Sequence, residues 1–433
     1  MEEKLLRVQK ELQTVSNSIS EAKMDGYDLE LALTYDDVLL RPKKSVVLSR
    51  RDTDVSTRLT KNLKLNIPVI AANMDTVCES QMAIALAQEG GIGFVHRFLT
   101  IERQVEEVLK VKRAESFIVE DPVTISFTAS VKDVKKLMEK QGVSGILVLN
   151  PTGKLVGIVT QRDLIFVEDF TLPVGEIMTP EERLITAPLG TTLDEAKKIL
   201  NKYKIEKLPL VDQEFRPKAL ITSRDILNMS AFPWSAKDKK GRLLVGAAVG
   251  VKHDYIERAE ALLHAGADVI VVDIAHGHSL LALNAIKELR KKLGEKFELI
   301  AGNVATAEGT KELIEAGANG IKIGVGPGAT CITRIVTGFG VPQLSAVLDC
   351  AKAADKYDIP VIADGGIRFP GDVTKALAAG ASTVMMGSVF AGTEETPGIP
   401  IVRKGAKYKI YRGMASFMAS VDRRGTENIS GRD

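Results

Sequence analysis

Eight short apolar runs, most of them separated by segments with helical spacing, dominate residues 31–114 and 229–433. The runs are 67–74, 91–96, 243–250, 268–275, 298–304, 320–326, 361–367 and 383–389. Helical periods occupy 255–265, 280–293, 306–316, 344–357 and 371–379. Parallel strands that are buried on both faces need such nearly continuous apolar sequences. The pattern therefore predicts an α/β fold, a (β/α)₈ TIM barrel, and an open doubly wound sheet is the alternative.

The segment between the two barrel stretches, 115–228, repeats itself with an offset of 62 residues. SVKDVKKLMEKQGV at 130–143 recurs as TLDEAKKILNKYKI at 192–205, and TQRD at 160–163 recurs as TSRD at 222–225. Each copy predicts a short strand, an amphipathic helix, two apolar strands and a final helix that begins after the aspartate. One copy alone cannot bury its apolar face, so we predict that the two pack together as an inserted domain.

Composition and charge exclude several other classes of protein. Charged residues make up 26% of the chain and the formal net charge is +2, so no strong field favours nucleic acid or anionic lipid. No apolar run reaches the roughly 20 residues that span a bilayer. Residues 1–30 alternate charges with Leu and Val, which predicts an amphipathic helical extension rather than a signal peptide. We therefore expect a cytoplasmic protein with no specific nucleic-acid partner and no membrane.

Glycines follow the last two predicted strands, in Gly365-Gly366 and Gly387-Ser388. Residues just after the strands of a TIM barrel form its active-site face, and this part of the barrel commonly binds phosphate. Glycine lets backbone N–H groups approach an oxyanion closely. The two turns predict a phosphate site, and tight turns without a ligand are the alternative.

The loop GVGPGATC at 324–331 carries the clearest signal for covalent chemistry. Its three glycines can point several backbone groups at one centre, and a cysteine at its end would be open to a substrate. A thiolate needs this access to attack. The three cysteines share no metal-ligand spacing. Cys78 and Cys350 suit a packing role, which is also the alternative for Cys331.

Other polar residues at strand ends remain open to two interpretations. Asp273 could hold ribose hydroxyls or cap the helix that follows. His276 and His278 could form a metal pair, but they lack a third ligand, which favours solvation. No GxGxxG opens a helix after the first strand, so a Rossmann site is not supported. Any nicotinamide cofactor would have to bind across the barrel mouth.

These motifs occur in the order found in the IMP dehydrogenase / GMP reductase family, which the chain resembles from residue 33 onward. The matching segments are LTYDDVLL at 33–40, NMDTV at 73–77, DIAHGHS at 273–279, AGNVAT at 301–306, the cysteine loop through Arg334, DGGIR at 364–368, MGS at 386–388, AGTEE at 391–395 and YRGM at 411–414. The repeated insert resembles a tandem CBS (Bateman) domain, which in this family binds adenine or guanine nucleotides. Thr160, Asp163, Thr222 and Asp225 match the nucleotide-binding positions of that motif.

The resemblance implies a reaction and a set of site residues. Cys331 would add to C2 of IMP, hydride would pass to NAD, and water, activated by Thr333 and by Arg423 on a mobile flap, would release XMP for guanine nucleotide synthesis. The implied substrate-binding residues are Met74, Asp364, Gly366, Gly387, Ser388, Tyr411, Gly413 and Met414. Asp273, Asn303 and Gly324 would bind the cofactor. Carbonyls of Gly326, Gly328 and Cys331 resemble a potassium site, and the family implies a homotetramer that can pair into octamers.

The chain departs from the family pattern at several positions. Ala72 and Ala329 replace serines, Ala415 replaces a glycine, and Arg424 replaces a tyrosine after the flap arginine. Family members continue for several dozen residues beyond the position of residue 433, so we expect a truncated flap. Two alternatives stay open. One is a GMP reductase, which uses the same cysteine to release ammonia and takes hydride from NADPH, and the other is a catalytically silent CBS nucleotide sensor.

Overall fold

The computed structural model describes residues 31–114, 119–120, 122–224, 226, 231–414 and 416, which divide into two compact units. The first unit contains the residues up to 114, then 234–238, and those from 243 onward. The second contains 115–233 and 239–242. The predicted helical extension at 1–30 and the predicted site residues Asp225 and Arg423 lie outside the described residues, as do Ala415 and Arg424.

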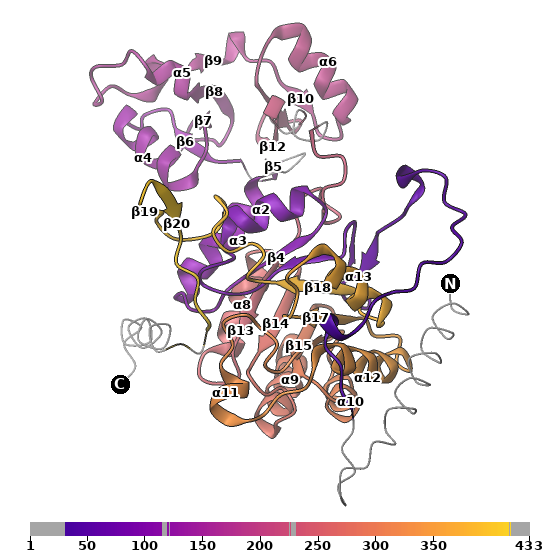
Figure 1. The fold of residues 1–433 in the computed structure, drawn as a ribbon. Helices are drawn as coiled ribbons and strands as arrows, with labels where there is room; N and C mark the ends of the chain where they lie inside the picture. The colour runs from indigo at the N-terminus through magenta and orange to yellow at the C-terminus, as the bar shows by residue number, and fades with distance from the viewer. Residues whose placement is uncertain are drawn as a thin grey trace, which may run out of the picture. The chain divides into compact units, whose positions relative to one another are not determined.

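A closed barrel of eight parallel strands forms the centre of the first unit (Figure 1). In barrel order the strands are β13 (Val245–Val249), β14 (Val269–Asp273), β15 (Glu298–Val304), β16 (Gly320–Ile323), β17 (Val361–Asp364), β18 (Thr383–Met386), β3 (Val69–Ala71) and β4 (Ile92–Val95). β4 pairs with β13 and closes the cylinder, although the second unit lies between them in sequence. The predicted (β/α)₈ barrel is confirmed. The open-sheet alternative is wrong, because no strand of this sheet is left as an edge.

Side chains of the strands alternate between the barrel interior and the surrounding helices, which explains the continuous apolar runs. In β14, Val269 and Val271 belong to the interior cluster, whereas Ile270 and Val272 belong to the cluster shared with the helices. Phe94 is the bulkiest of the fully buried side chains and lies in the interior cluster. β1 (Thr57–Arg58) and β2 (Lys64–Leu65) form a small antiparallel pair beside this cluster.

Helices follow the strands and pack around the barrel (Figure 1). They are α2 (Ser80–Gln88), α3 (Ile101–Ala114), α8 (Tyr255–His264), α9 (Leu280–Leu293), α10 (Ala307–Glu315), α11 (Thr333–Thr337), α12 (Gln343–Asp355) and α13 (Pro370–Ala378), with 3-10 turns η1 (Tyr35–Asp37) and η2 (Arg50–Asp52). The five helices expected from apolar spacing are present, each with ends within two residues of the prediction. None of the helices in the described part of the chain combines the length and apolar content that crossing a bilayer requires.

Two four-stranded sheets with matching helices make up the second unit, one strand more in each than the repeat predicts. One sheet contains β6 (Thr124–Ser126), β7 (Gly145–Leu149), β8 (Leu155–Thr160) and β9 (Thr179–Pro180), and the other β10 (Ala187–Pro188), β11 (Lys207–Val211), β12 (Pro217–Thr222) and β5 (Val119–Glu120). The helices are α4 (Val131–Gln141), α5 (Gln161–Leu164) and α6 (Leu193–Tyr203), with turns η3 (Val174–Glu176) and η4 (Glu181–Arg183). Leucines and other apolar residues of both sheets share one buried cluster.

Equivalent capping residues begin the equivalent helices of the two repeats. Ser130 accepts a hydrogen bond from the backbone N–H of Asp133, and Thr192 accepts one from Glu195, at the same point of each copy. These caps satisfy backbone donors that a helix start leaves unpaired. The last helix of the first repeat, however, begins at Gln161 rather than after Asp163, because the Asp163 carboxylate caps it from inside its first turn.

Candidate functional site

The carboxyl ends of the barrel strands bring most of the predicted site residues to one end of the cylinder. Asp273, Asn303 and Asp364 lie at or near the ends of β14, β15 and β17, and the cysteine loop follows β16. Met74 follows β3, and Gly387 follows β18. Parallel strands in a barrel all end at the same face, so residues that are hundreds of positions apart in sequence meet there.

A buried lysine joins two of these strand-end carboxylates. Lys322, in the middle of β16, is 2% exposed. Its Nζ donates to Oδ1 of Asp273 and to Oδ2 of Asp364, both at 2.8 Å. Asn303 Nδ2 also donates to Asp364 Oδ2, at 3.0 Å, and to the carbonyl of Gly324, at 2.8 Å. The four side chains form one hydrogen-bonded network across neighbouring strands and the start of the cysteine loop.

The charges of this network stabilise one another. Burial alone would raise the pKa of Asp273, but the Lys322 ammonium outweighs burial and holds that pKa below its ordinary value, with Arg97 adding to the effect. Burial alone would lower the pKa of Lys322, but the carboxylates of Asp273 and Asp364 raise it. Lys322 is therefore charged at neutral pH, and Asp273 is a carboxylate that can accept hydrogen bonds. Asp273 does not cap the following helix, since Ser279 is the N-cap of α9.

The cysteine loop places its sulfur at the mouth of the barrel. Cys331 is half-buried, and its Sγ lies 3.3 Å from Oγ1 of Thr333. The Cys331 N–H donates to the Gly328 carbonyl at 3.0 Å, which folds the end of the loop into a turn. Cys78 and Cys350 are fully buried, and burial raises the pKa of each thiol. Of the three cysteines, Cys331 alone is exposed enough to react with a substrate.

Glycine is required where this loop leaves β16. Gly324 has φ +145°, and a Cβ at this position would lie 2.2 Å from the carbonyl oxygen of Asp364. The loop also runs close to the predicted phosphate turn, because a Cβ on Gly365 would lie 3.2 Å from the Gly328 nitrogen. The cysteine loop, Asp364 and the first of the predicted phosphate turns are thus in contact.

The second predicted phosphate turn, 387–388, meets the segment that carries Tyr411. A Cβ on Gly387 would lie 3.0 Å from both the Met74 sulfur and the Tyr411 hydroxyl. Burial raises the pKa of Tyr411, a hydrogen bond to Thr330 opposes this, and Asp364 adds to the rise. The Tyr411 hydroxyl is therefore protonated at neutral pH and can donate to an anion.

Gly413 and Met414 complete the substrate-binding set predicted at this mouth. A Cβ on Gly413 would lie 2.9 Å from the Thr330 carbonyl, so this glycine packs against the cysteine loop. The Met414 sulfur lies 3.5 Å from the backbone nitrogen of Asp75. Ser388 directly follows Gly387 and is half-buried.

The predicted regulatory residues in the second unit are only partly described. Thr160 donates through both its N–H and its hydroxyl to Asp163 Oδ2, each at 2.7 Å. Thr222 ends β12, in the position that Thr160 has at the end of β8. The two threonines therefore have equivalent places in the two repeats.

The two histidines of the His-Gly-His segment have different surroundings. His278 Nε2 lies 3.3 Å from Glu312, and His276 is exposed. Among the described residues no three His, Cys, Asp or Glu side chains are grouped to hold a metal ion.

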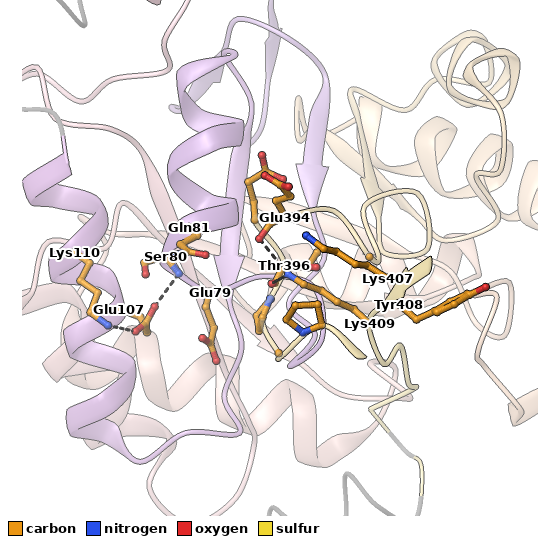
Figure 2. A pocket seen from close by; sticks show the side chains of 15 residues that line it. Glu79, Ser80, Gln81, Glu107, Lys110, Glu394, Thr396, Lys407, Tyr408 and Lys409 are labelled. Atoms are coloured by element: carbon orange, nitrogen blue, oxygen red, sulfur yellow. Dashed lines mark hydrogen bonds and ion pairs between the residues drawn. The ribbon is translucent and has the colours of Figure 1, made fainter. Parts of the chain in front are cut away.

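A cavity of about 550 Å³ lies away from these residues, among α2, α3 and the segment 392–409. Figure 2 shows its lining side chains, with Glu107 bonded to the Ser80 N–H at 2.8 Å and to Lys110 at 2.5 Å. Lys409 donates to the carbonyls of Glu394 and Thr396, at 3.1 and 2.6 Å. Glu107, Lys110 and Lys409 thus bond within the cavity wall, and no predicted site residue lines the cavity.

Sequence reasoning missed the lysine at the centre of the network. Lys322 lies inside a run whose pattern predicts only an apolar strand. The available signal was the single charged residue in the sequence GIKI at 320–323. Ile321 and Ile323 face the helices. Because side chains of a strand alternate between its two faces, residue 322 must point into the barrel. A charged residue in such a position needs a buried partner.

Comparisons with known proteins agree over nearly the whole chain. Residues 32–431 match the family model described as the IMP dehydrogenase / GMP reductase domain. An inosine-5′-monophosphate dehydrogenase of Nitrosopumilus maritimus is 54% identical over 92% of this chain and 83% of its own length, and one of Aquifex aeolicus is 55% identical over 92% and 82%. A solved GMP reductase of Trypanosoma brucei, in complex with guanosine 5′-monophosphate, is 45% identical, covers 92% of this chain and 85% of its own, and has a TM-score of 0.87.

Proposed function

Because the chain belongs to the IMP dehydrogenase / GMP reductase family, we propose that it oxidises IMP to XMP with NAD through a covalent bond between Cys331 and the purine. The observation that carries the proposal is the contact between the cysteine loop and the 365–366 glycine turn. The loop in contact with this turn is the one that carries Cys331, which among the three cysteines is the one not buried, and this supports a nucleotide held with its purine near that thiol.

The reaction needs a nucleophile, a hydride acceptor and water. The Cys331 thiolate adds to C2 of IMP, C2 loses a hydride to NAD, and a thioimidate remains. Water then adds to C2 and the thiol leaves, so that IMP, NAD and water give XMP, NADH and a proton. Thr333, whose hydroxyl is 3.3 Å from the sulfur, would help activate that water together with Arg423.

The substrate contacts follow from the chemistry of the groups at the mouth. Asp364 would accept hydrogen bonds from the ribose hydroxyls. Lys322 and Asn303 both donate to its Oδ2 atom. Neither of them uses Oδ1, which is the atom that would accept from the ribose. The backbone N–H groups of Gly366, Gly387 and Ser388 and the protonated Tyr411 hydroxyl would hold the phosphate. Met74, Gly413 and Met414 would contact the base.

The remaining polar groups of the network are proposed to bind NAD. Asp273, Asn303 and Gly324 would hold its nicotinamide riboside, and NAD supplies the hydride acceptor. The Asn303 Oδ1 atom supports this assignment, because it is buried and has no hydrogen-bond partner among the described residues. A polar ligand that donates to this oxygen would remove the cost of leaving it unpaired.

A potassium ion is proposed at the carbonyls of Gly326, Gly328 and Cys331. Hard cations bind oxygen ligands such as backbone carbonyls. The Gly328 carbonyl accepts one hydrogen bond from Cys331, and a carbonyl oxygen has a second lone pair for a cation. The ion would hold the loop that carries the nucleophile.

The inserted unit is proposed to be a CBS pair that binds adenine or guanine nucleotides at Thr160, Asp163, Thr222 and Asp225. Family resemblance supports a homotetramer that can pair into octamers. The proposed substrates are soluble nucleotides, which supports the expected location in the cytoplasm.

The assay that tests the proposal follows reduced nicotinamide by absorbance, with IMP plus NAD in one reaction and GMP plus NADPH in another. We expect turnover with IMP and NAD. Cys331→Ser should abolish that turnover and leave IMP binding largely intact, since it changes only the nucleophilic atom. Comparable turnover in Cys331→Ser would contradict the covalent route.

GMP reduction is the second candidate, because the GMP-bound reductase of Trypanosoma brucei superposes with a TM-score of 0.87. Turnover only with GMP and NADPH would select it. Absence of turnover in both reactions, together with ATP binding by the inserted unit, would favour a nucleotide sensor.

A further inference from the structure

The segment that carries Tyr411 and Met414 has no regular secondary structure. It follows β20 (Ala406–Tyr408), which pairs only with β19 (Ile401–Arg403). Its position relative to the barrel therefore cannot come from strand or helix hydrogen bonds. Side-chain contacts must determine where the predicted phosphate and base contacts lie.

One ion pair joins this segment to the turn that follows β3. Arg412 Nε donates to Asp75 Oδ2 at 2.9 Å, and Arg412 Nη2 contacts the same oxygen. The Asp75 side chain is 9% exposed and that of Arg412 is 22% exposed. The pair is thus largely shielded from water, and it links residues that are 337 positions apart in the chain.

Weaker contacts around the ion pair involve Tyr411 and Met414, two of the predicted substrate-binding residues of this segment. The Arg412 N–H donates to Thr76 Oγ1 at 3.4 Å, and the Asp75 N–H points to the Met414 sulfur at 3.5 Å. The Tyr411 hydroxyl lies 4.0 Å from the Met74 sulfur. Tyr411 and Met414 therefore flank Arg412 in sequence, and each contacts the turn after β3 that carries Asp75.

We infer that Asp75 and Arg412 are positioning residues whose ion pair sets the places of Tyr411 and Met414 for binding a purine nucleotide 5′-monophosphate. The inference rests on the proposed function of the barrel mouth and adds two residues to it. Neither side chain needs to touch the nucleotide. Their pairing fixes a segment that the backbone leaves unsupported.

The geometry favours a local effect on binding over a general effect on stability. The barrel is closed by the ladders of its eight strands, and residues 409–414 take no part in them. Loss of the pair would release this segment without opening the barrel. The expected defect is weaker nucleotide binding by a folded protein.

Calorimetric titration of the full chain with IMP, and separately with GMP, in the absence of nicotinamide tests the inference. We expect Arg412→Gln to weaken binding of the preferred nucleotide by about tenfold or more, since truncating one partner leaves a shielded charge unpaired. Asp75→Asn should have a similar effect. The double variant should lose less than the product of the two single losses, because both changes break the same interaction.

Steady-state kinetics separates positioning from support of the fold. With turnover measured, KM for the nucleotide should rise by about the same factor while kcat falls by less than about threefold, as expected when binding rather than the chemical step is lost. Arg58→Gln is the matched control, because Arg58 forms an ion pair with Asp358 that is far more exposed. It should leave both constants unchanged.

Two results would overturn the inference or its premise, and they differ. If the unmodified chain binds neither nucleotide, the proposed function is wrong. If it binds one, and both single variants have circular dichroism spectra of the folded protein and bind with unchanged affinity, the positioning role is wrong. Should Arg412→Gln fail to fold, Asp75→Asn, which keeps the size of the side chain, tests the positioning role by itself.

Discussion

Replacing Lys322 with methionine tests whether the buried network at the barrel mouth is held by the lysine charge. Methionine keeps most of the volume of the side chain and removes the ammonium. The carboxylates of Asp273 and Asp364 would then face each other without the cation between them. We expect a large loss of stability whose size depends on pH.

The magnitude follows from the two contacts of Nζ. Each of the two bonded carboxylate oxygens is 2.8 Å from Nζ, so the two oxygens are at most about 5.6 Å apart. Two unit charges at this separation repel by about 3 kcal/mol at an effective dielectric constant of about 20. Removing one partner of a buried pair costs roughly 3–5 kcal/mol in measured cases. Arg97, which also lowers the pKa of Asp273, offsets part of this cost. We expect Lys322→Met to lose about 3 kcal/mol at pH 7.

The pH dependence has a definite sign. In the unmodified protein the pKa of Asp273 is lowered, so its stabilising contribution is present above the unfolded pKa of about 4 and is lost as the pH falls through the folded value. In Lys322→Met, the half-buried Asp273 carboxylate has lost the ammonium and still faces the negative charge of Asp364, which favours its protonated form, so stability is lost as the pH rises. The difference between the two proteins should be largest at pH 7 and shrink toward about pH 4.

Urea unfolding at a series of pH values measures this difference. Lys311→Met is the control, because Lys311 and Glu315 form an exposed pair within one helix and such pairs contribute only about 0.3–0.5 kcal/mol. A loss below about 1 kcal/mol at pH 7, or a loss that is constant across the series, would refute the electrostatic reasoning.

Two further predictions concern the cysteine loop and the inserted unit. Gly324→Ala should lower the free energy of unfolding by at least about 1–3 kcal/mol, because φ is +145° and the new Cβ would meet the Asp364 carbonyl at 2.2 Å. Thermal unfolding and turnover measure this effect, and an unchanged melting temperature would contradict it. Thr160→Ala removes the hydroxyl that donates to Asp163. It should weaken ATP binding by the inserted unit and leave turnover without ATP unchanged. An ATP affinity equal to that of the unmodified protein, measured by titration, would exclude Thr160 from the proposed nucleotide site.

Much of the barrel could be predicted because its physical constraint is local. A strand buried on both faces is apolar at nearly every position, so the sequence between 268 and 275 already indicates a strand of the type that β14 forms. Once the barrel is assumed, its topology places the residues that follow the strands on one face. Asp273, Asn303 and Asp364 can therefore be selected from the amino-acid sequence alone.

The contacts within the site could not be predicted, because they depend on pairings across the barrel. Lys322 bonds to residues 49 and 42 positions away, and nothing in the local pattern shows which carboxylates it meets. Asp75 and Arg412 both lie within recognised motifs, yet their pairing spans 337 positions. The sequence pattern places the start of α5 too late for a different reason, since a capping aspartate can lie inside the first turn as well as before it.

The pairing of β5 with β12 shortens the loop that the barrel must close during folding. Gly93 and Val245 are partners across the β4–β13 seam, and about 150 residues separate them, for which loop-closure entropy is considerable. Glu120 and Ala219, however, are partners within the inserted unit, so an insert that folds first reduces the effective loop to about 50 residues and the entropic cost by about 1 kcal/mol. A domain whose two ends lie close together can thus be inserted into the barrel at little cost in loop-closure entropy. If the inserted unit folds early, closure of the barrel should be faster.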